Sequence, residues 1–366
     1  MKGKKVLVTG AAGMQGRALA KDLVNQENVD FVYGIDDFSR DYLDNPKAWA
    51  RSLERKERKF KFDKMRYQDL KESDLAHFDA VIHLAAFVSV PESIISKEQQ
   101  LRYRENNAIG PYDLLLKLKY GIPKKHWPVF VYASTAETFG ETMKLPYKPE
   151  CAQNPQSPYA ACKLFAEVIG NVYAKDYDYP FVAVRSFNTF GPNQNCGFEE
   201  SNGTPEAAVV ALFIKKALTG EDLHVHGTGK QTRDFQYVAD MVTAYRRLAL
   251  SERVDEKGLY FHRGRKYNLG TGRDTSIDQL ADMIISISGS SSRKIQTPIR
   301  PGEIMAMRAD YTDIVRDTGY QSTVQLEDGL KIAIDWYRKQ LQGNGQGTLK
   351  HIKAERSHVY QDALTQ

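Results

Sequence analysis

Two side chains that can move a proton, Tyr159 and Lys163, stand four residues apart in the segment SPYAACKLFAEVIG. On a helix this spacing places them on one face, one turn apart. A lysine ammonium next to a phenol favours the phenolate and lowers the pKa of the phenol from its ordinary value of about 10. The pair therefore predicts a tyrosine that works as general acid and base near neutral pH. Two surface residues can show the same spacing by chance.

A second group of polar residues follows an apolar run in YASTAETFG, residues 132–140. Thr135 comes at the end of the predicted strand, where open α/β sheets carry their chemistry. Glu137 stands two residues further on the same loop. It has two interpretations, a solvated loop residue or a carboxylate directed into a pocket, where burial would raise its pKa.

A glycine-rich loop in VTGAAGMQGRALAKDLV joins the first predicted strand to a helix. Gly10, Gly13 and Gly16 suit a tight turn, a close approach of a pyrophosphate and close helix packing, and the helix dipole favours the anion. Asp36 ends the second predicted strand, where an acid accepts hydrogen bonds from a ribose and repels a 2′-phosphate, which predicts NAD rather than NADP. Asp69, in RYQDLKE, is a weaker candidate on the adenine side. A tight turn without a ligand is the alternative.

Short apolar runs alternate with amphipathic segments of helix length over the first half of the chain. This alternation predicts a doubly wound parallel sheet, a Rossmann-like α/β fold. The predicted strands are KVLVTG (5–10), FVYGIDD (31–37), DAVIHLAA (79–86), VFVYAST (129–135) and FVAVRSFN (181–188).

After Gly191 the strands become shorter and more scattered, which indicates a smaller α/β substrate-binding domain. The expected division is an NAD-binding domain over 1–190 with returning segments near 228–250 and 266–271, a substrate-binding domain over 191–227 and 272–341, and a tail over 342–366. Residues 47–66 carry nine Lys or Arg and are expected to be a solvated connection between two strands.

The composition excludes several classes of function. A net charge of +5 from 51 basic and 46 acidic residues is too small to indicate nucleic acid, although it suits an anionic small molecule. The three cysteines have no paired spacing, so we expect neither a disulfide framework nor a metal site, and a cytoplasmic location. No apolar run approaches the ~18 residues of a membrane helix, so no membrane segment is expected.

Taken together, TGAAGMQG, HLAAFVSVPESI, YASTAETFG, SPYAACK and RSFNTFGP resemble the extended short-chain dehydrogenase/reductase family. The resemblance runs from about residue 5 to 340, and the family includes nucleotide-sugar 4-epimerases, 4,6-dehydratases and UDP-glucuronate decarboxylases. It implies tightly held NAD, a nucleoside-diphosphate-sugar substrate and a homodimer formed through the helices near 97–118 and 155–175.

Position by position, the resemblance assigns roles on both sides of the expected site. On the reacting side, it matches Thr135 to a hydroxyl that binds the sugar, Tyr159 to the catalytic base and Lys163 to its partner. Asn107 matches an asparagine near the cofactor. On the substrate side, the resemblance matches Asn188 and Arg233 to groups that hold the diphosphate, and Arg300 and Glu303 to a pair that holds phosphate and nucleotide ribose.

Three reactions share the bound 4-keto sugar that this resemblance implies. The loop AAFVSVPESI is similar to that of the epimerases, whereas STAETFG and QTRDFQYV are more similar to the dehydratases and decarboxylases. Ala136, which can donate no proton, stands where glucose dehydratases carry an aspartate. The leading expectation is therefore 4-epimerisation, with 4,6-dehydration or decarboxylation as the alternative. A dinucleotide-sensing scaffold without activity is the non-enzymatic alternative, and the intact Thr135, Tyr159 and Lys163 argue against it.

Overall fold

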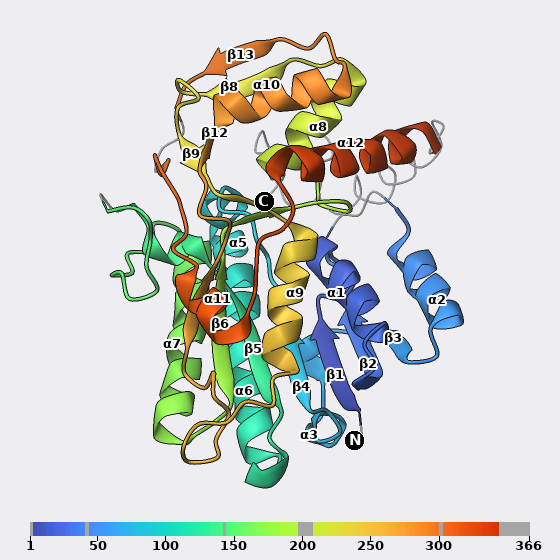
Figure 1. Ribbon diagram of the computed structural model, residues 1–366, viewed down its shortest axis with the longest axis vertical. Coiled ribbons are helices and arrows are strands. Elements are labelled where there is room, and N and C mark those ends of the chain that lie inside the picture. The colour runs from blue at the N-terminus through green and yellow to red at the C-terminus, as the bar shows by residue number, and fades with distance from the viewer. Residues whose placement is uncertain (1–2, 41–43, 142–143, 197–207, 300–302, 344–366) are drawn as a thin grey trace, which may run out of the picture.

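A seven-stranded parallel sheet forms the centre of the protein (Figure 1). The structure is a computed structural model that describes residues 3–40, 44–141, 144–196, 208–299 and 303–343. The strand order is β11-β6-β5-β4-β1-β2-β3, and every neighbouring pair is parallel. The strands are β1 (Lys4–Thr9), β2 (Val29–Asp36), β3 (Phe60–Lys64), β4 (Ala80–His83), β5 (Val129–Thr135), β6 (Phe181–Ser186) and β11 (Lys266–Leu269).

Helices cover both faces of this sheet, which explains why its central strands read as continuous apolar runs. Val6 and Val8 of β1 belong to one hydrophobic core, and Leu7 between them belongs to the other. The first face is covered mainly by α1 (Met14–Val24), α2 (Pro46–Lys56), α9 (Val238–Ala249) and α11 (Thr312–Thr318). The second face is covered mainly by α3 (Glu72–Leu75), α6 (Gly110–Tyr120) and α7 (Pro158–Asp176).

The basic segment 47–66 differs from its prediction as a solvated connection. It contains most of α2 and all of β3, the edge strand of the sheet. The reason is that Phe60 is fully buried and packs on Trp49, so the apolar residues of this segment face the core while its lysines and arginines face solvent.

Short helical elements lie in the connections between β3 and α7. They are the 3-10 helices η1 (Tyr67–Asp69), η3 (Lys124–His126) and η4 (Ala136–Phe139), the α-helices α4 (Glu92–Ile95) and α5 (Lys97–Tyr103), and the π-helix η2 (Arg104–Ile109).

A smaller α/β layer stands above the carboxyl ends of the strands (Figure 1). It contains three two-stranded sheets, pairing β10 with β7, β12 with β9, and β13 with β8. Its helices are α8 (Val209–Thr219), α10 (Ile277–Ser288) and α12 (Leu326–Gly343). Its strands are β7 (Asn188–Phe190), β8 (Leu223–His226), β9 (Thr232–Arg233), β10 (Phe235–Tyr237), β12 (Thr275–Ser276) and β13 (Lys294–Thr297). The expected boundary at residue 190 falls at the end of β7 and stays a prediction.

The order of the strands reverses between β1 and β4, so their following loops diverge and leave a crevice at the carboxyl ends. Chemistry in open α/β sheets is placed at this point. Within the part of the chain that the structure describes, no helix has the length and apolarity needed to cross a membrane.

Candidate active site

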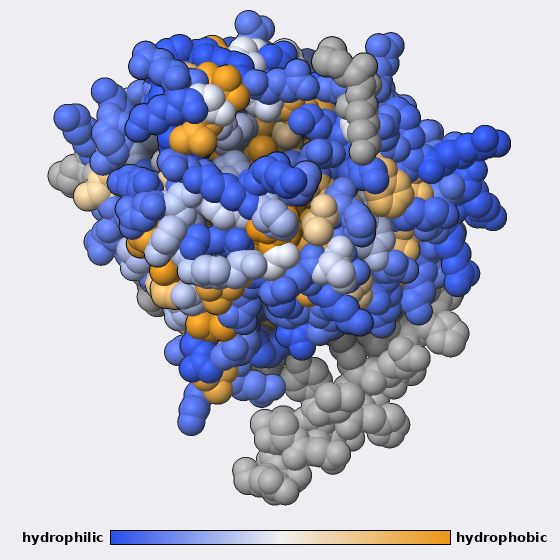
Figure 2. Space-filling view, turned by 90° about the horizontal axis from the view of Figure 1, so that it is seen from below, coloured by the Kyte–Doolittle hydropathy of each residue, from blue (hydrophilic) through white to orange (hydrophobic). Residues whose placement is uncertain are grey.

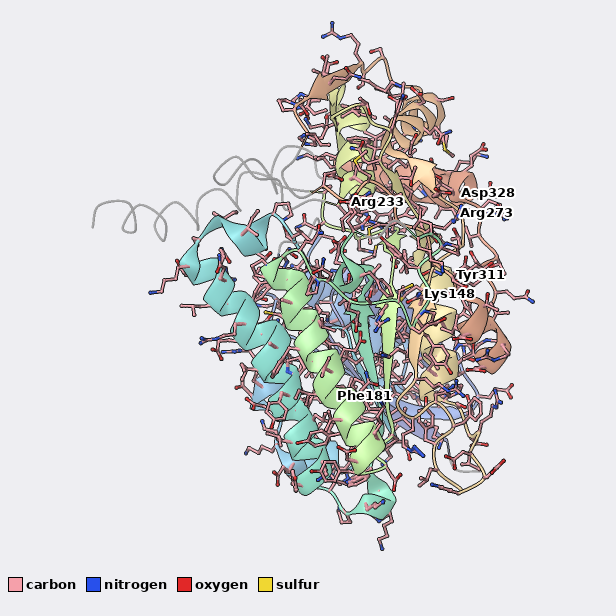
Figure 3. All side chains as sticks on the ribbon, turned by 90° about the vertical axis from the view of Figure 1, so that its left-hand side faces the viewer. Lys148, Phe181, Arg233, Arg273, Tyr311 and Asp328 are labelled. Atoms are coloured by element: carbon pink, nitrogen blue, oxygen red, sulfur yellow. The ribbon has the colours of Figure 1, made fainter. Side chains whose placement is uncertain are left out.

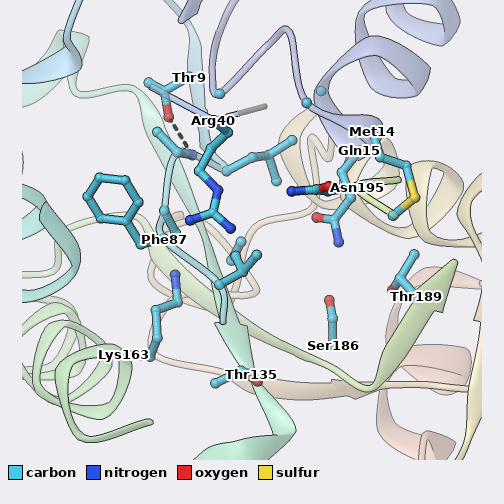
Figure 4. Close-up of a pocket in the computed structure, with 18 of the residues that line it drawn as sticks. Thr9, Met14, Gln15, Arg40, Phe87, Thr135, Lys163, Ser186, Thr189 and Asn195 are labelled. Atoms are coloured by element: carbon cyan, nitrogen blue, oxygen red, sulfur yellow. Dashed lines mark hydrogen bonds between the residues drawn. The ribbon is translucent and has the colours of Figure 1, made fainter. Parts of the chain in front are cut away.

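A cavity of about 380 Å³ occupies this crevice and extends under the smaller layer (Figure 4). Its walls come from the ends of β1, β2, β4, β5 and β6, from β7, and from the first turns of α1 and α7. Of the residues singled out in the sequence, it brings together Gly10, Gly13, Gly16, Asp36, Thr135, Glu137, Tyr159, Lys163 and Asn188.

The glycine loop at one end of the cavity is packed too closely for side chains at two of its positions. Gly10 has φ +70°, and a Cβ there would lie 2.8 Å from the Ala85 nitrogen. A Cβ at Gly16 would lie 2.2 Å from the Gly10 carbonyl oxygen, whereas one at Gly13 would only touch that oxygen at 3.4 Å. The start of α1 carries no acidic residue in its first turn, so its exposed N–H groups suit an anion.

Asp36 lies beside this loop at the end of β2. Its carboxylate accepts hydrogen bonds from the Ala12 nitrogen at 3.0 Å and the Phe38 nitrogen at 2.9 Å, which fixes the loop against the strand. The close-packed glycines and the acid at one end, with Tyr159 and Lys163 at the other, fit an extended dinucleotide.

Two cofactor-side candidates lie outside the walls of the cavity. Asp69 is exposed at the end of η1, and its neighbours Arg66 and Tyr67 line the cavity in its place. Asn107 is buried in η2, where its side chain accepts from the Phe87 nitrogen at 3.0 Å and donates to the Phe87 oxygen at 2.7 Å. It therefore holds the loop after β4, and Phe87 of that loop lines the cavity.

Tyr159 lies in the first turn of α7, which begins at Pro158 after the N-cap Ser157. Burial raises the pKa of Tyr159 to about 12. A hydrogen bond with Thr135 lowers this pKa, and the charge of Glu137 raises it. The structure thus does not bear out the lowered pKa expected for this phenol, because burial is the largest influence and only the hydrogen bond with Thr135 opposes it. Thr135, at the end of β5, forms a hydrogen bond with Tyr159, and its expected role as the hydroxyl that binds the sugar stays a prediction.

Lys163 is one turn further along the same face of α7, and its side chain is directed into the cavity (Figure 4). Its ammonium lies 4.5 Å from the centre of the Tyr132 ring. Burial lowers the pKa of Lys163 to about 7, and the nearby charges of Glu167 and Cys162 oppose that change. A lysine with this pKa can gain or lose a proton near neutral pH.

Glu137 lies on η4 and lines the cavity, so the interpretation as a solvated loop residue is wrong. Burial raises the pKa of its carboxyl group, Arg233 lowers it and Glu303 raises it again. Because Glu137 also raises the pKa of Tyr159, it stands within electrostatic reach of both the phenol and the Arg233–Glu303 pair.

Arg233, expected to hold the diphosphate, lies where the smaller layer joins the sheet (Figure 3). Arg233 of β9 forms an ion pair with Glu303 at 2.6 Å and donates to the Ile304 oxygen at 2.7 Å. Of the two residues expected to hold phosphate and nucleotide ribose, Arg300 lies outside the described residues and Glu303 is the ion-pair partner of Arg233. Neither Arg233 nor Glu303 lines the cavity itself, whereas Asn188 does.

Sequence reasoning missed several residues of the cavity wall. Arg40 reaches over it from the loop after β2 and forms an ion pair with Glu92 at 2.9 Å, and Phe87 lies beside it (Figure 4). Ser134 and Ser186, at the ends of β5 and β6, also line it. The position of Ser186 at the carboxyl end of a predicted strand was a usable signal, but Arg40 carried none.

A family model described as GDP-mannose 4,6 dehydratase matches residues 7–333. Among curated relatives, the UDP-glucose 4-epimerase of Mycolicibacterium smegmatis is 30% identical, over 92% of this chain and 100% of its own. The UDP-N-acetyl-alpha-D-glucosaminuronate decarboxylase of Bacillus cytotoxicus is 30% identical, over 92% of this chain and 98% of its own.

Solved structures show the same architecture. A UDP-glucuronic acid 4-epimerase from Bacillus cereus, in complex with UDP-glucuronic acid and NAD, superimposes with a TM-score of 0.78 at 29% identity. The match covers 92% of this chain and 99% of that one.

Proposed function

The chain belongs to the GDP-mannose 4,6-dehydratase family of extended short-chain dehydrogenases/reductases, and from this membership we propose that it is an NAD-dependent enzyme that converts a nucleotide sugar through a bound 4-keto sugar. The reaction that the site supports best is 4-epimerisation of a nucleoside-diphosphate hexose. The relatives named above act on UDP-linked sugars, which makes UDP-hexoses the first substrates to try.

Each group of residues in the cavity has its own role in the proposed reaction. The glycine loop and Asp36 hold the dinucleotide, and NAD supplies, when bound, a hydride acceptor and the positive charge of its nicotinamide ring. Thr135 orients the C4 hydroxyl of the sugar, and Tyr159 accepts its proton. Tyr159 starts as the phenolate and becomes the neutral phenol when it takes this proton. Lys163 as an ammonium stabilises the starting phenolate, which offsets the effect of burial on the pKa of Tyr159. When the ketone is reduced on its other face, Tyr159 returns the proton.

One observation carries the choice of epimerisation. Ala136, between Thr135 and Glu137, is buried with 2% of its surface exposed and places a methyl group beside the reacting residues. Loss of the C6 hydroxyl as water needs a proton donor for that hydroxyl, and Ala136 cannot be that donor. A 4-epimerase needs only the Tyr159 proton carrier and a ketone that presents both faces.

A second candidate, an elimination across C5 and C6 or a decarboxylation, is favoured by Glu137. A carboxyl group with a raised pKa in the same cavity is suited to taking a proton from C5. The test is mass spectrometry of products from a panel of UDP-, GDP- and dTDP-sugars. Unchanged mass with altered retention supports 4-epimerisation, loss of water supports dehydration, and loss of carbon dioxide supports decarboxylation.

We expect Glu137→Gln to keep turnover within about threefold of wild type, because glutamine still accepts a hydrogen bond from a sugar hydroxyl. Glu137→Ala should lose about 3- to 10-fold, the usual effect of one uncharged hydrogen bond. The measurement is turnover in heavy water, with the product examined by NMR. Deuterium at C5 in the wild-type product but not in the glutamine variant would make Glu137 a base and replace epimerisation by C5 chemistry.

The proposed enzyme is a homodimer, supported by an apolar stripe on α7. Phe165, Val168 and Val172 are exposed on one side of this helix, and Tyr112 of α6 packs against Phe165 at 6.3 Å. Figure 3 shows the two helices side by side on the outer surface. The end of the molecule seen in Figure 2 instead shows only small hydrophobic groups among hydrophilic residues.

Light scattering during gel filtration should therefore give twice the chain mass of 41.5 kDa. Val168→Glu, which places a charge in the centre of the stripe, should give the mass of one chain. Twice the chain mass for that variant as well would move the interface to another surface.

A further inference from the structure

A buried ion pair joins the helix that carries Tyr159 and Lys163 to the sheet beneath it. Glu167 of α7 is paired with Arg185 of β6, and their side chains are 1% and 0% exposed. The contact is bidentate, with Arg185 Nη2 donating to Glu167 Oε1 at 2.5 Å and Nε donating to Oε2 at 3.1 Å. Arg185 also donates through Nη1 to the Pro149 oxygen at 2.7 Å.

The carboxylate of Glu167 is held from two further directions. The Ser134 hydroxyl of β5 donates to Oε2 at 2.7 Å, and the Gln153 amide donates to Oε1 at 3.5 Å. One carboxylate thus binds β5, β6 and the chain before α7 at a single point.

The partners of this carboxylate are direct neighbours of the reacting residues. Ser134 precedes Thr135, Arg185 precedes Ser186, and Ser134, Thr135 and Ser186 line the cavity. Glu167 lies one turn beyond Lys163 on the buried face of α7.

A fully buried ion pair is weak evidence for stability, since apolar residues of similar volume often stabilise a fold as well or better. Its worth here is in geometry, because a displacement of a reacting group by about 1 Å can cost ~10²-fold in rate. We propose that Glu167, held by Arg185 and Ser134, is a positioning residue that fixes the face of α7 bearing Tyr159 and Lys163 against the ends of β5 and β6. This inference rests on the proposed function.

The charge of Glu167 also acts on Lys163. Burial favours the neutral amine, and among the charged neighbours Glu167 is the main one that favours the ammonium. The titratable and charged groups around Lys163 are Tyr159, Cys162 and Glu167 on α7, His83 on β4, Tyr132 on β5, Arg185 on β6 and Arg104 on η2.

The direction of the pH effect follows from the sign of this charge. Tyr159 and Lys163 share protons, so their pH–rate profile reports the pair rather than either group. Removing a negative charge beside the pair makes both proton losses easier, and the profile moves to lower pH. Removing the charge of Glu167 also disfavours the form of the pair that has a phenolate and an ammonium, because this charge is closest to the ammonium. The maximum rate therefore falls.

The experiment uses Glu167→Gln together with Arg185→Met in one variant. Glutamine keeps one acceptor oxygen, for the Ser134 hydroxyl, because Ser134 and Gln153 donate to different oxygens of Glu167. Methionine removes the cation that would otherwise be buried without its partner. The matched control is Asp240→Asn, another buried carboxylate with four hydrogen bonds, to Ser322, Thr323 and Val324, which does not line the cavity. Each protein is compared with wild type by melting temperature, by KM and kcat against pH, and by the pKa of Lys163.

The pKa of Lys163 is measured by competitive labelling with acetic anhydride and mass spectrometry, which needs no turnover. We expect the double variant to stay folded, keep KM within about threefold and lose at least about tenfold in kcat. Because Glu167 but not Arg185 is among the charges that shift the pKa of Lys163, removing both groups should still lower the Lys163 pKa and the pH optimum. Asp240→Asn should lower the melting temperature and change neither pH-dependent quantity.

A folded double variant with wild-type kcat, or with a wild-type Lys163 pKa and pH optimum, would overturn the proposal. If Glu167→Gln alone unfolds, the double variant still decides the question. If no nucleotide sugar is converted by wild type, the proposed function fails, but the labelling result still tests the role of Glu167.

Discussion

Tyr159→Phe should bind NAD and the nucleotide sugar as wild type does and lose at least about 10²-fold in kcat, the lower end for the loss of a general acid/base group. The phenyl ring keeps the shape of the buried side chain and removes only the hydroxyl that contacts Thr135. Since the C4 proton then has no carrier, hydride transfer stops with it. Turnover of the identified substrate and titration of its binding measure the two quantities.

Tyr103→Phe is the matched control, because Tyr103 lies next to Tyr159 with ring centres 6.3 Å apart and also loses a buried hydroxyl. Its hydroxyl binds Ser89 and Glu92 and does not line the cavity. We expect it to lower the melting temperature and to keep kcat within about threefold, because the hydrogen bonds that it loses, each worth about 1 kcal/mol, hold Ser89 and Glu92 and not the reacting groups. Near-wild-type kcat in Tyr159→Phe would assign the proton carrier to another residue.

Gly16→Ala should abolish measurable NAD binding and reduce the free energy of unfolding by about 1–3 kcal/mol, the usual cost of overpacking. The added Cβ would lie 2.2 Å from the Gly10 oxygen and 2.6 Å from the Ala11 Cα, and both are backbone atoms. The start of α1 therefore has to move away from β1, and the loop that faces the dinucleotide moves with it. Calorimetry of NAD binding and thermal unfolding of the same sample measure both effects.

Gly13→Ala separates the two effects, because its Cβ would touch only the Gly10 oxygen at an ordinary 3.4 Å. This variant should melt close to wild type and bind NAD about tenfold more weakly, since its methyl group enters the cavity where the pyrophosphate would approach the backbone. If Gly16→Ala binds NAD normally, the glycine loop is only a tight turn.

The parts of the site that could be predicted from the sequence are those fixed by local spacing. Gly10, Gly13 and Gly16 lie within one loop, and Tyr159 and Lys163 lie on one helix turn, so local geometry brings each set together. The end of a predicted strand pointed to Thr135, and the resemblance to a family added Asn188; both line the cavity.

The features that could not be predicted from the sequence depend on packing between distant segments. Glu167 and Arg185 meet only once α7 lies across β5 and β6, although an arginine inside the apolar run FVAVRS was a signal of a buried partner. The pKa of Tyr159 depends on how deeply the phenol is buried, which spacing does not reveal. Strand β3 was hidden because FKFDK alternates apolar and charged residues, as an edge strand with one solvated face does.

Strand β11 pairs with β6 on the side away from β5. Its residues are synthesised long after Tyr159 and Lys163 have left the ribosome. Until residues 266–269 emerge, β6 is an apolar strand with an open edge, and such edges pair with other chains. The first 190 residues thus hold the proton carriers but not the strand that protects them from aggregation. A fragment that ends there should self-associate during synthesis, and a chaperone that covers the edge of β6 would be needed until β11 takes its place.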